Sequence, residues 1–220
     1  MYIKRGVKLK LFITATNTDV GKTYTTIKLI ETLSDMGVNC GVCKPIETGV
    51  EDYPKDASLL LESISKYNSN FAKLNPVDIT AYTFKLPSAP YTADKKRVID
   101  TKIIQNKIDS LSKLCDILII EGAGGLMVPI KRDYFMIDLA KSSNKTLLVT
   151  DDKLGCINNT LLSINILKSY NIDYDWCVNT RKNSMFETTT KPFYDDYFDS
   201  WWSLKNGLKS YCKTLLKYAI

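Results

Sequence analysis

The chain contains no histidine. This absence excludes Ser-His-Asp and Cys-His nucleophilic sites, the usual zinc sites that contain histidine, and imidazole as a general base. Long apolar runs are missing as well: none reaches the roughly 18 residues of a membrane-spanning helix, so we expect no membrane span. Residues 1–8 carry charge but lack the apolar region of a secretory signal, which favours a cytoplasmic protein.

The six cysteines are spread too widely for a disulfide scaffold, and two of them form the motif Cys40-Gly-Val-Cys43. Such a pair can serve redox or metal chemistry where it opens a helix. This pair lies inside a predicted strand, which favours two small buried hydrophobic residues. We therefore expect reduced thiols, in keeping with a cytosolic protein.

Most of the net charge of +6 can be traced to the C-terminal end of the chain. Lysines recur there at every fourth residue: Lys205, Lys209, Lys213 and Lys217. Leu204, Leu208, Tyr211 and Leu215 follow the other periodicity, so the segment predicts an amphipathic helix. The lysine stripe is either a solvated helix face or a surface for a membrane or nucleic acid. We favour the solvated face and expect neither partner.

Strand and helix patterns alternate along the chain. Strands are predicted for residues 9–15, 39–44, 117–120, 146–149 and 174–178, and helices for residues 22–36, 56–64, 99–114 and 157–170. This alternation predicts an α/β fold, a doubly wound, mainly parallel sheet with helices on both faces. We expect one domain over residues 1–220, in which the C-terminal segment 183–220 is the least legible part.

The turn after the first predicted strand reads Ala15-Thr-Asn-Thr-Asp-Val-Gly21-Lys22-Thr23. Glycine, lysine and threonine at the start of a helix are typical of a phosphate-binding loop, in which backbone N–H groups and the lysine face phosphates and the threonine hydroxyl can bind Mg²⁺. The strict pattern is not met, because Ala15 replaces a first glycine and five residues precede Gly21. A chance sequence in an ordinary helix is the alternative. The place between strand and helix favours a P-loop NTPase-like nucleotide site.

Two other predicted strand ends carry charged residues. Glu121 follows the run 117–120 and precedes Gly-Ala-Gly-Gly; a carboxylate there points into the crevice where parallel sheets bind ligands, and Mg²⁺ takes one or two carboxylates together with phosphates. Lys44, in Lys44-Pro-Ile-Glu-Thr48-Gly, adds a positive charge to the same rim. Taken singly, Glu121 could face solvent and Lys44 could be a solvated turn residue. Their shared rim with the phosphate loop favours a common site.

Four motifs together resemble the dethiobiotin synthetase family in order and spacing over residues 9–180: Thr14-Ala-Thr-Asn-Thr-Asp-Val-Gly-Lys-Thr, Lys44-Pro-Ile-Glu-Thr-Gly, Glu121-Gly-Ala-Gly-Gly and Lys153-Leu-Gly-Cys-Ile-Asn158. The resemblance implies an ATP- and Mg²⁺-dependent cyclo-ligase that forms C–N bonds. Its substrate would be 7,8-diaminononanoate, closed with CO2 to dethiobiotin through a carbamate and a carbamic-phosphoric anhydride, with release of ADP and phosphate. This is the penultimate step of biotin synthesis, and the family's enzymes are homodimers.

The same resemblance implies roles for individual residues. Lys44 and Lys22 are expected to be catalytic. The nucleotide is expected at Asp19, Val20, Gly21, Lys22, Thr23, Tyr24, Asp56, Glu121, Gly122, Ala123, Gly124 and Asn179. The substrate is expected at Lys44, Thr48, Gly155, Cys156, Ile157 and Asn158, of which the last four receive its carboxylate across the dimer interface at a helix N-terminus. The metal ligands are expected to be Thr23, Asp56 and Glu121.

One departure from the family concerns the nucleotide base. Family members commonly carry a Gly-x-x-Pro stretch that closes on the base, and residues 183–220 contain none. We therefore expect these residues to form no base pocket. Two other classes have similar phosphate loops. Partition-type ATPases usually hold a second lysine in the loop, which this loop lacks, and corrinoid amide-forming synthetases need a glutaminase domain for which we expect no room.

Overall fold

The computed structural model describes residues 8–181 and 185–218. A five-stranded sheet lies at its centre, in the order β2-β5-β1-β8-β9, and every neighbouring pair is parallel. The strands are β1 (Leu9–Ala15), β2 (Cys40–Cys43), β5 (Ile117–Glu121), β8 (Lys145–Asp151) and β9 (Tyr174–Asn179). The predicted mainly parallel α/β sheet is confirmed.

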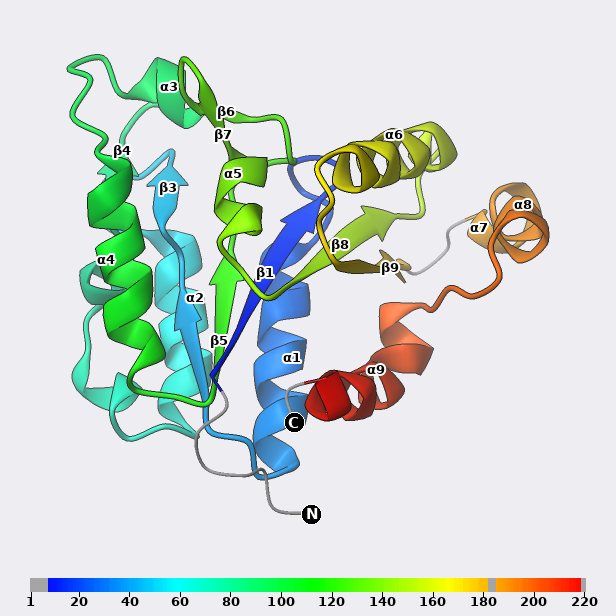
Figure 1. Cartoon of the computed structure of the whole chain (residues 1–220), viewed down its shortest axis with the longest axis horizontal. Coiled ribbons are helices and arrows are strands. Elements are labelled where there is room, and N and C mark those ends of the chain that lie inside the picture. The colour runs from blue at the N-terminus through cyan, green and yellow to red at the C-terminus, as the bar shows by residue number, and fades with distance from the viewer. Residues whose placement is uncertain (1–7, 182–184, 219–220) are drawn as a thin grey trace.

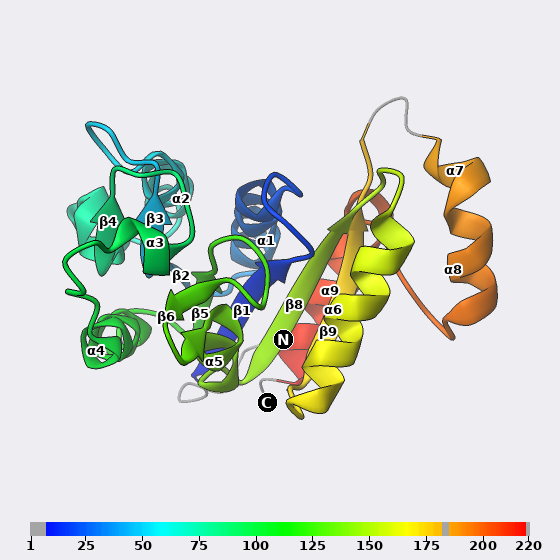
Figure 2. The ribbon, with the colours of Figure 1, turned by 90° about the horizontal axis from the view of Figure 1, so that it is seen from above.

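Helices cover both faces of the sheet (Figures 1 and 2). One face carries α1 (Lys22–Asp35) and α2 (Lys55–Ser65), and the other carries α4 (Thr101–Ser112), α5 (Met136–Lys141) and α6 (Cys156–Ser169). The C-terminal helix α9 (Leu204–Tyr218) packs against α1 and β9. The shorter elements are β3 (Ile46–Thr48), η1 (Phe71–Lys73), η2 (Pro76–Ile79), β4 (Tyr82–Phe84), α3 (Pro90–Ala93), β6 (Pro129–Lys131), β7 (Tyr134–Phe135), α7 (Phe186–Thr189) and α8 (Lys191–Tyr197).

Local signals account for the helix ends. Gly37, just past α1, has a φ of 82°, and the Val38 N–H donates to the Leu33 carbonyl at 3.1 Å, as in a glycine-terminated helix. Helix α4 begins later than predicted because Asp100 caps it: its carboxylate accepts the Lys102 N–H at 2.8 Å.

The strand order indicates which edge of the sheet binds ligands. From central β1 the chain crosses through α1 to β2 on one side, and it later passes from β5 to β8 on the other side. In open parallel sheets ligands bind beyond the carboxyl ends of the strands where the winding direction reverses. The loops after β1 and β5 therefore meet at one rim.

The tail owes its structure to aromatic packing. Helices α7 and α8 lie at the edge of the molecule beside α6 and β9 (Figure 2). Trp176 of β9 contacts Phe198 with ring centroids 4.6 Å apart, and Tyr194 contacts Trp176 at 5.2 Å and Trp201 at 5.9 Å. Both helices are too short to show a helical period of apolar residues in the sequence. Residues 183 and 184, the start of the least legible segment, lie outside the described residues.

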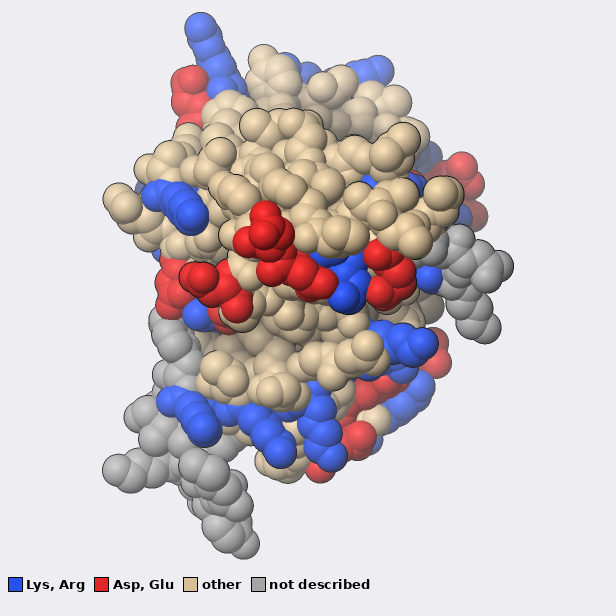
Figure 3. All heavy atoms as spheres, turned by 90° about the vertical axis from the view of Figure 1, so that its right-hand side faces the viewer, with Lys and Arg blue, Asp and Glu red and all other residues tan. Residues whose placement is uncertain are grey.

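The predicted C-terminal helix is confirmed. Leu204, Tyr211 and Leu215 are buried, whereas Lys205, Lys209, Lys213 and Lys217 are exposed. Basic side chains gather along the lower part of the face on which α9 lies (Figure 3). Within residues 8–181 and 185–218, no helix is both long and apolar enough to cross a membrane.

The cysteine pair behaves as small buried side chains. Cys40 and Cys43 are buried and free, and burial raises the pKa of both thiols. A thiol that resists ionisation is a poor nucleophile and a poor metal ligand. The structure therefore favours the packing interpretation of this motif over redox or metal chemistry.

Candidate active site

The phosphate loop is tied to strand β9. Gly21 caps α1 with a φ of 104°, and a Cβ atom added to it would lie 2.2 Å from Asn179 Nδ2, so only glycine fits. The Asn179 amide donates to the Val20 carbonyl at 2.9 Å. At the start of α1 the buried Lys22 Nζ donates to the Asn17 carbonyl at 3.1 Å. The loop is thus held in shape from both sides.

A buried ion cluster lies beside this loop. Lys44, which directly follows β2, is 3% exposed, and its Nζ lies 2.6 Å from Glu121 Oε1 and 3.0 Å from Asp56 Oδ2. It also donates to the Gly122 carbonyl at 3.3 Å. Glu121 ends β5 and Asp56 lies in the first turn of α2. Three residues that the sequence singled out on separate elements therefore meet at one point.

Two hydroxyls complete the surroundings of Glu121. Thr23 Oγ1 donates to Glu121 Oε1 at 2.9 Å, and Thr26 Oγ1 donates to Oε2 at 2.8 Å. With Lys44 these donors replace the water that the fully buried carboxylate loses. Sequence reasoning missed Thr26, although it lies one helical turn after Lys22, where it shares a face with Thr23.

The two lysines of the site have opposite pKa shifts. Burial, together with the charge of Lys44, lowers the pKa of Lys22 to about 8. Burial also disfavours the charged form of Lys44, but the carboxylates of Glu121 and Asp56 outweigh it and raise the pKa of Lys44. Lys44 is therefore charged over the whole neutral range, whereas the charged form of Lys22 would be favoured by an anion bound beside it.

A cavity of about 600 Å³ opens onto this cluster. It is lined by Thr18, Asp19, Gly21, Lys22, Thr23, Lys44, Ile46, Glu47, Thr48, Asp56, Pro87, Ser88, Ala89, Pro90, Ala123, Gly124 and Val128. Most of the residues expected to bind the phosphates and the metal are among them, and so is Thr48, which was expected to contact the substrate. Sequence reasoning missed Glu47 and the segment 87–90, for which no motif was available.

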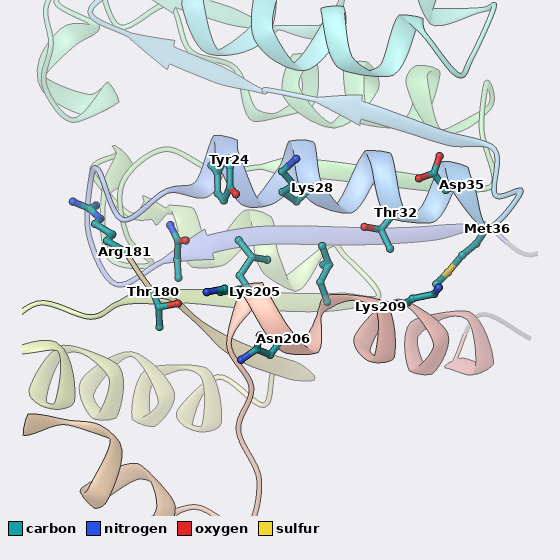
Figure 4. A pocket seen from close by; sticks show the side chains of 13 residues that line it. Tyr24, Lys28, Thr32, Asp35, Met36, Thr180, Arg181, Lys205, Asn206 and Lys209 are labelled. Atoms are coloured by element: carbon teal, nitrogen blue, oxygen red, sulfur yellow. The ribbon is translucent and has the colours of Figure 1, made fainter. Parts of the chain in front are cut away.

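A second cavity, of about 820 Å³, lies between α1 and α9 (Figure 4). Tyr24 and Asn179 line it together with Leu204, Lys205 and Asn206 at the start of α9. Although no base pocket was expected from residues 183–220, the start of α9 lines this cavity beside Asn179, the residue expected at the base. The missing Gly-x-x-Pro stretch could not reveal this placement, because it depends on how α9 packs against α1.

The segment expected to receive a substrate carboxylate lies elsewhere. Gly155 caps α6 with a φ of 93°, and the buried Cys156 Sγ lies 3.5 Å from Thr190 Oγ1. Ile157 and Asn158 follow in the first turn of α6, and none of these residues lines either cavity. Leu154, just before them, is 97% exposed.

The oxygen ligands fit a magnesium ion held jointly with a nucleotide. Among the described residues, no group of three or more His, Cys, Asp or Glu side chains is placed to hold a metal. Glu121 and Asp56 nevertheless share one ammonium, and the Thr23 hydroxyl contacts Glu121. Mg²⁺ prefers such hard oxygens and usually takes its remaining ligands from water and phosphate.

Comparisons with known proteins identify the family of the chain. A family model described as an AAA domain matches residues 9–175. A protein of Sulfurovum sp. called ATP-dependent dethiobiotin synthetase BioD is 55% identical over 207 residues, which cover 93% of this chain and 99% of that protein. This chain belongs to the dethiobiotin synthetase family. Family members from Wolinella succinogenes and Helicobacter pylori are 37% and 38% identical, over 94% and 84% of this chain and 97% and 88% of their own lengths.

Solved structures show that the family's fold is shared more widely. The MinD cell division protein of Aquifex aeolicus matches with a TM-score of 0.51 and 19% identity, over 93% of this chain and 86% of its own. A ParA family ATPase of Chlorobium tepidum matches with a TM-score of 0.54 and 12% identity, over 97% and 98%. At these identities the likeness concerns the fold alone.

Proposed function

We propose that the chain closes 7,8-diaminononanoate with CO2 to dethiobiotin at the expense of ATP. One observation carries the proposal: Lys22, Lys44, Asp56 and Glu121 meet at the rim of the sheet in a chain of this family. The substrate amine attacks CO2, the resulting carbamate takes the γ-phosphoryl group, and the second amine closes the ring and expels phosphate. ADP and phosphate leave with the product.

This reaction suits a site without a protein nucleophile. Phosphoryl transfer depends mainly on position and on positive charge around anionic oxygens. We assign the phosphates to the loop residues Asp19 to Thr23 and to the backbone of Gly122, Ala123 and Gly124. Lys22, whose pKa is lowered to about 8 by burial and by the charge of Lys44, supplies charge to the β and γ oxygens.

Lys44 is proposed to stabilise the transferring group and the carbamate, with Thr48 beside it. Its raised pKa keeps the ammonium charged across the neutral range, so it acts as an electrostatic group and not as a proton acceptor. Its cavity also contains Thr48 and Ser88, whose hydroxyls can hydrogen-bond the diamine or the carbamate.

Thr23, Asp56 and Glu121 are proposed to hold Mg²⁺ when nucleotide is bound. The ion supplies charge that neutralises the phosphate oxygens. In the structure the single ammonium of Lys44 pairs with both carboxylates and offsets half of their charge. The base end of the nucleotide is assigned to the cavity lined by Tyr24 and Asn179.

In a homodimer, the first turn of α6 would be able to contact the substrate bound to the partner subunit. Residues 155–158 line neither cavity of their own chain, and the exposed Leu154 precedes them. We propose that Gly155, Cys156, Ile157 and Asn158 receive the substrate carboxylate in the partner's site, where the positive end of a helix favours an anion. The dimer and a cytoplasmic location stay predictions.

Dependence of ATP hydrolysis on the substrate tests the function. We expect ADP release only when 7,8-diaminononanoate and bicarbonate are both present. A partition-type ATPase would hydrolyse ATP without either. Equal ADP release with and without the diamine would therefore contradict the proposal.

A further inference from the structure

Glu47 lies at the centre of the site, but the reaction as proposed gives it no task. It belongs to β3, between Lys44 and Thr48, lines the Lys44 cavity and is only 6% exposed. Its Oε1 accepts the Asp56 N–H at 2.9 Å, and its Oε2 accepts the Ala57 N–H at 2.9 Å. Both N–H groups belong to the first turn of α2.

Glu47 takes the place of the capping side chain that the residue preceding a helix usually supplies. The residue before α2 is Pro54, which offers no side-chain acceptor, so the first N–H groups of α2 need a partner from elsewhere. A carboxylate at this end of a helix is favoured both by hydrogen bonding and by the helix dipole. Glu47 meets this need from a different strand and so joins α2 to β3.

We propose that Glu47 is a positioning residue that fixes Asp56 for metal binding. Its two hydrogen bonds hold the backbone that carries the Asp56 carboxylate, whose Oδ2 lies 3.0 Å from Lys44 Nζ. Glu47 itself contacts neither Lys44 nor Glu121 through a hydrogen bond or ion pair among the described residues. Its effect therefore reaches the metal only through Asp56, and the inference rests on the proposed role of Asp56 as a metal ligand.

The test measures binding of Mn²⁺ in the presence of ADP, followed by electron paramagnetic resonance and without turnover. Glu47→Gln keeps the shape but leaves a single acceptor oxygen, and it directs an amide N–H toward a backbone N–H. Groups that orient metal ligands are typically worth 10–100-fold in metal affinity, so we expect the Mn²⁺ dissociation constant to rise about tenfold. Glu47→Asp, which keeps the charge but is shorter, should show a smaller rise.

Asp94→Asn is the matched control. Asp94 is also buried, and its two oxygens accept the Val98 and Ile99 N–H groups, each at 2.9 Å, but it does not line the cavity. Asp94→Asn and Glu47→Gln should both lower the melting temperature, because each weakens two hydrogen bonds between a buried carboxylate and backbone N–H groups. Asp94→Asn should leave Mn²⁺ binding unchanged. An equal loss of Mn²⁺ affinity in both variants would reduce Glu47 to a structural role and overturn the inference.

Asp56→Asn separates this inference from the proposed function. If Asp56→Asn weakens Mn²⁺ binding and Glu47→Gln and Glu47→Asp do not, the positioning role is wrong and the metal role of Asp56 stands. If Asp56→Asn leaves Mn²⁺ binding unchanged, both are wrong.

Discussion

Replacing Lys44 by methionine removes the ammonium that Glu121 and Asp56 share. At an effective dielectric constant of about 20, unit charges 2.6 Å apart attract by about 6 kcal/mol, and the desolvation of both ions offsets much of this. Removing one partner of a buried pair typically costs about 3–5 kcal/mol, because the other charge stays buried. Thr23 and Thr26 still donate to Glu121, so we expect the lower value, about 3 kcal/mol.

Two assays follow from this magnitude. For a chain of this length 1 kcal/mol corresponds to roughly 2–4 °C, so Lys44→Met should lower the melting temperature by about 6–12 °C. Adding Glu121→Gln should recover much of this loss, since the double variant no longer buries an unpaired charge. Turnover of Lys44→Met should fall about 10²–10³-fold, the usual effect of removing one group that stabilises the transition state.

The refuting result is equally definite. If Lys44→Met melts like the parent chain and keeps most of its turnover, Lys44 is not part of a charged site, whatever its distances. If it loses stability but keeps turnover, the ion cluster is structural and the catalytic assignment is wrong.

Three further outcomes are expected. Glu121→Gln should shift the Mg²⁺ dependence of turnover to higher concentration more than it weakens diamine binding; an unchanged Mg²⁺ titration would remove Glu121 from the metal site. ATP binding near pH 8.5 should be accompanied by proton uptake, because Lys22 has a pKa of about 8 in the free chain and becomes charged beside phosphate. Calorimetry in two buffers of different ionisation enthalpy measures this uptake. Lys22→Met should abolish the uptake, and uptake that persists in the variant would refute the assignment. ATP should be preferred over GTP by only about 10–200-fold in kcat/KM, because Asn179 gives one of its two amide N–H groups to Val20 and leaves one donor and one acceptor for a base. A ratio above about 10⁴ would show a closed base site.

The same Lys22 shift predicts a direction for stability. The folded-state pKa lies below the ordinary value of 10.5, so the unfolded chain binds more protons between about pH 8 and 10.5. The contribution of Lys22 to stability therefore improves as pH rises through this window. Below pH 8 its desolvation cost is fully present.

The central sheet and the charged rim could be predicted from the sequence. The buried runs of β5 and β8 and the stop at Gly37 are local signals, and each appears in the structure at or near its expected residues. Lys44 directly follows β2 and Glu121 ends β5, and parallel strands bring their carboxyl ends to one edge of the sheet. Their meeting therefore follows from the topology.

Other features depend on contacts between distant segments. Glu47 caps a helix that starts eight residues later, and a strand-like sequence pattern carries no sign of this. The short helices α7 and α8 are fixed by aromatic contacts with Trp176, not by a period of their own. Leu204 reaches the cavity at Asn179 only because α9 packs back onto α1.

Incorporation of labelled carbon tests the central claim most directly. The purified chain would be given ATP, Mg²⁺, 7,8-diaminononanoate and ¹³C-bicarbonate, and the products would be measured by mass spectrometry. We predict dethiobiotin that carries one ¹³C atom, formed in a one-to-one ratio with ADP and only in the complete mixture. ADP formed without labelled dethiobiotin, or at the same rate without the diamine, would contradict the account.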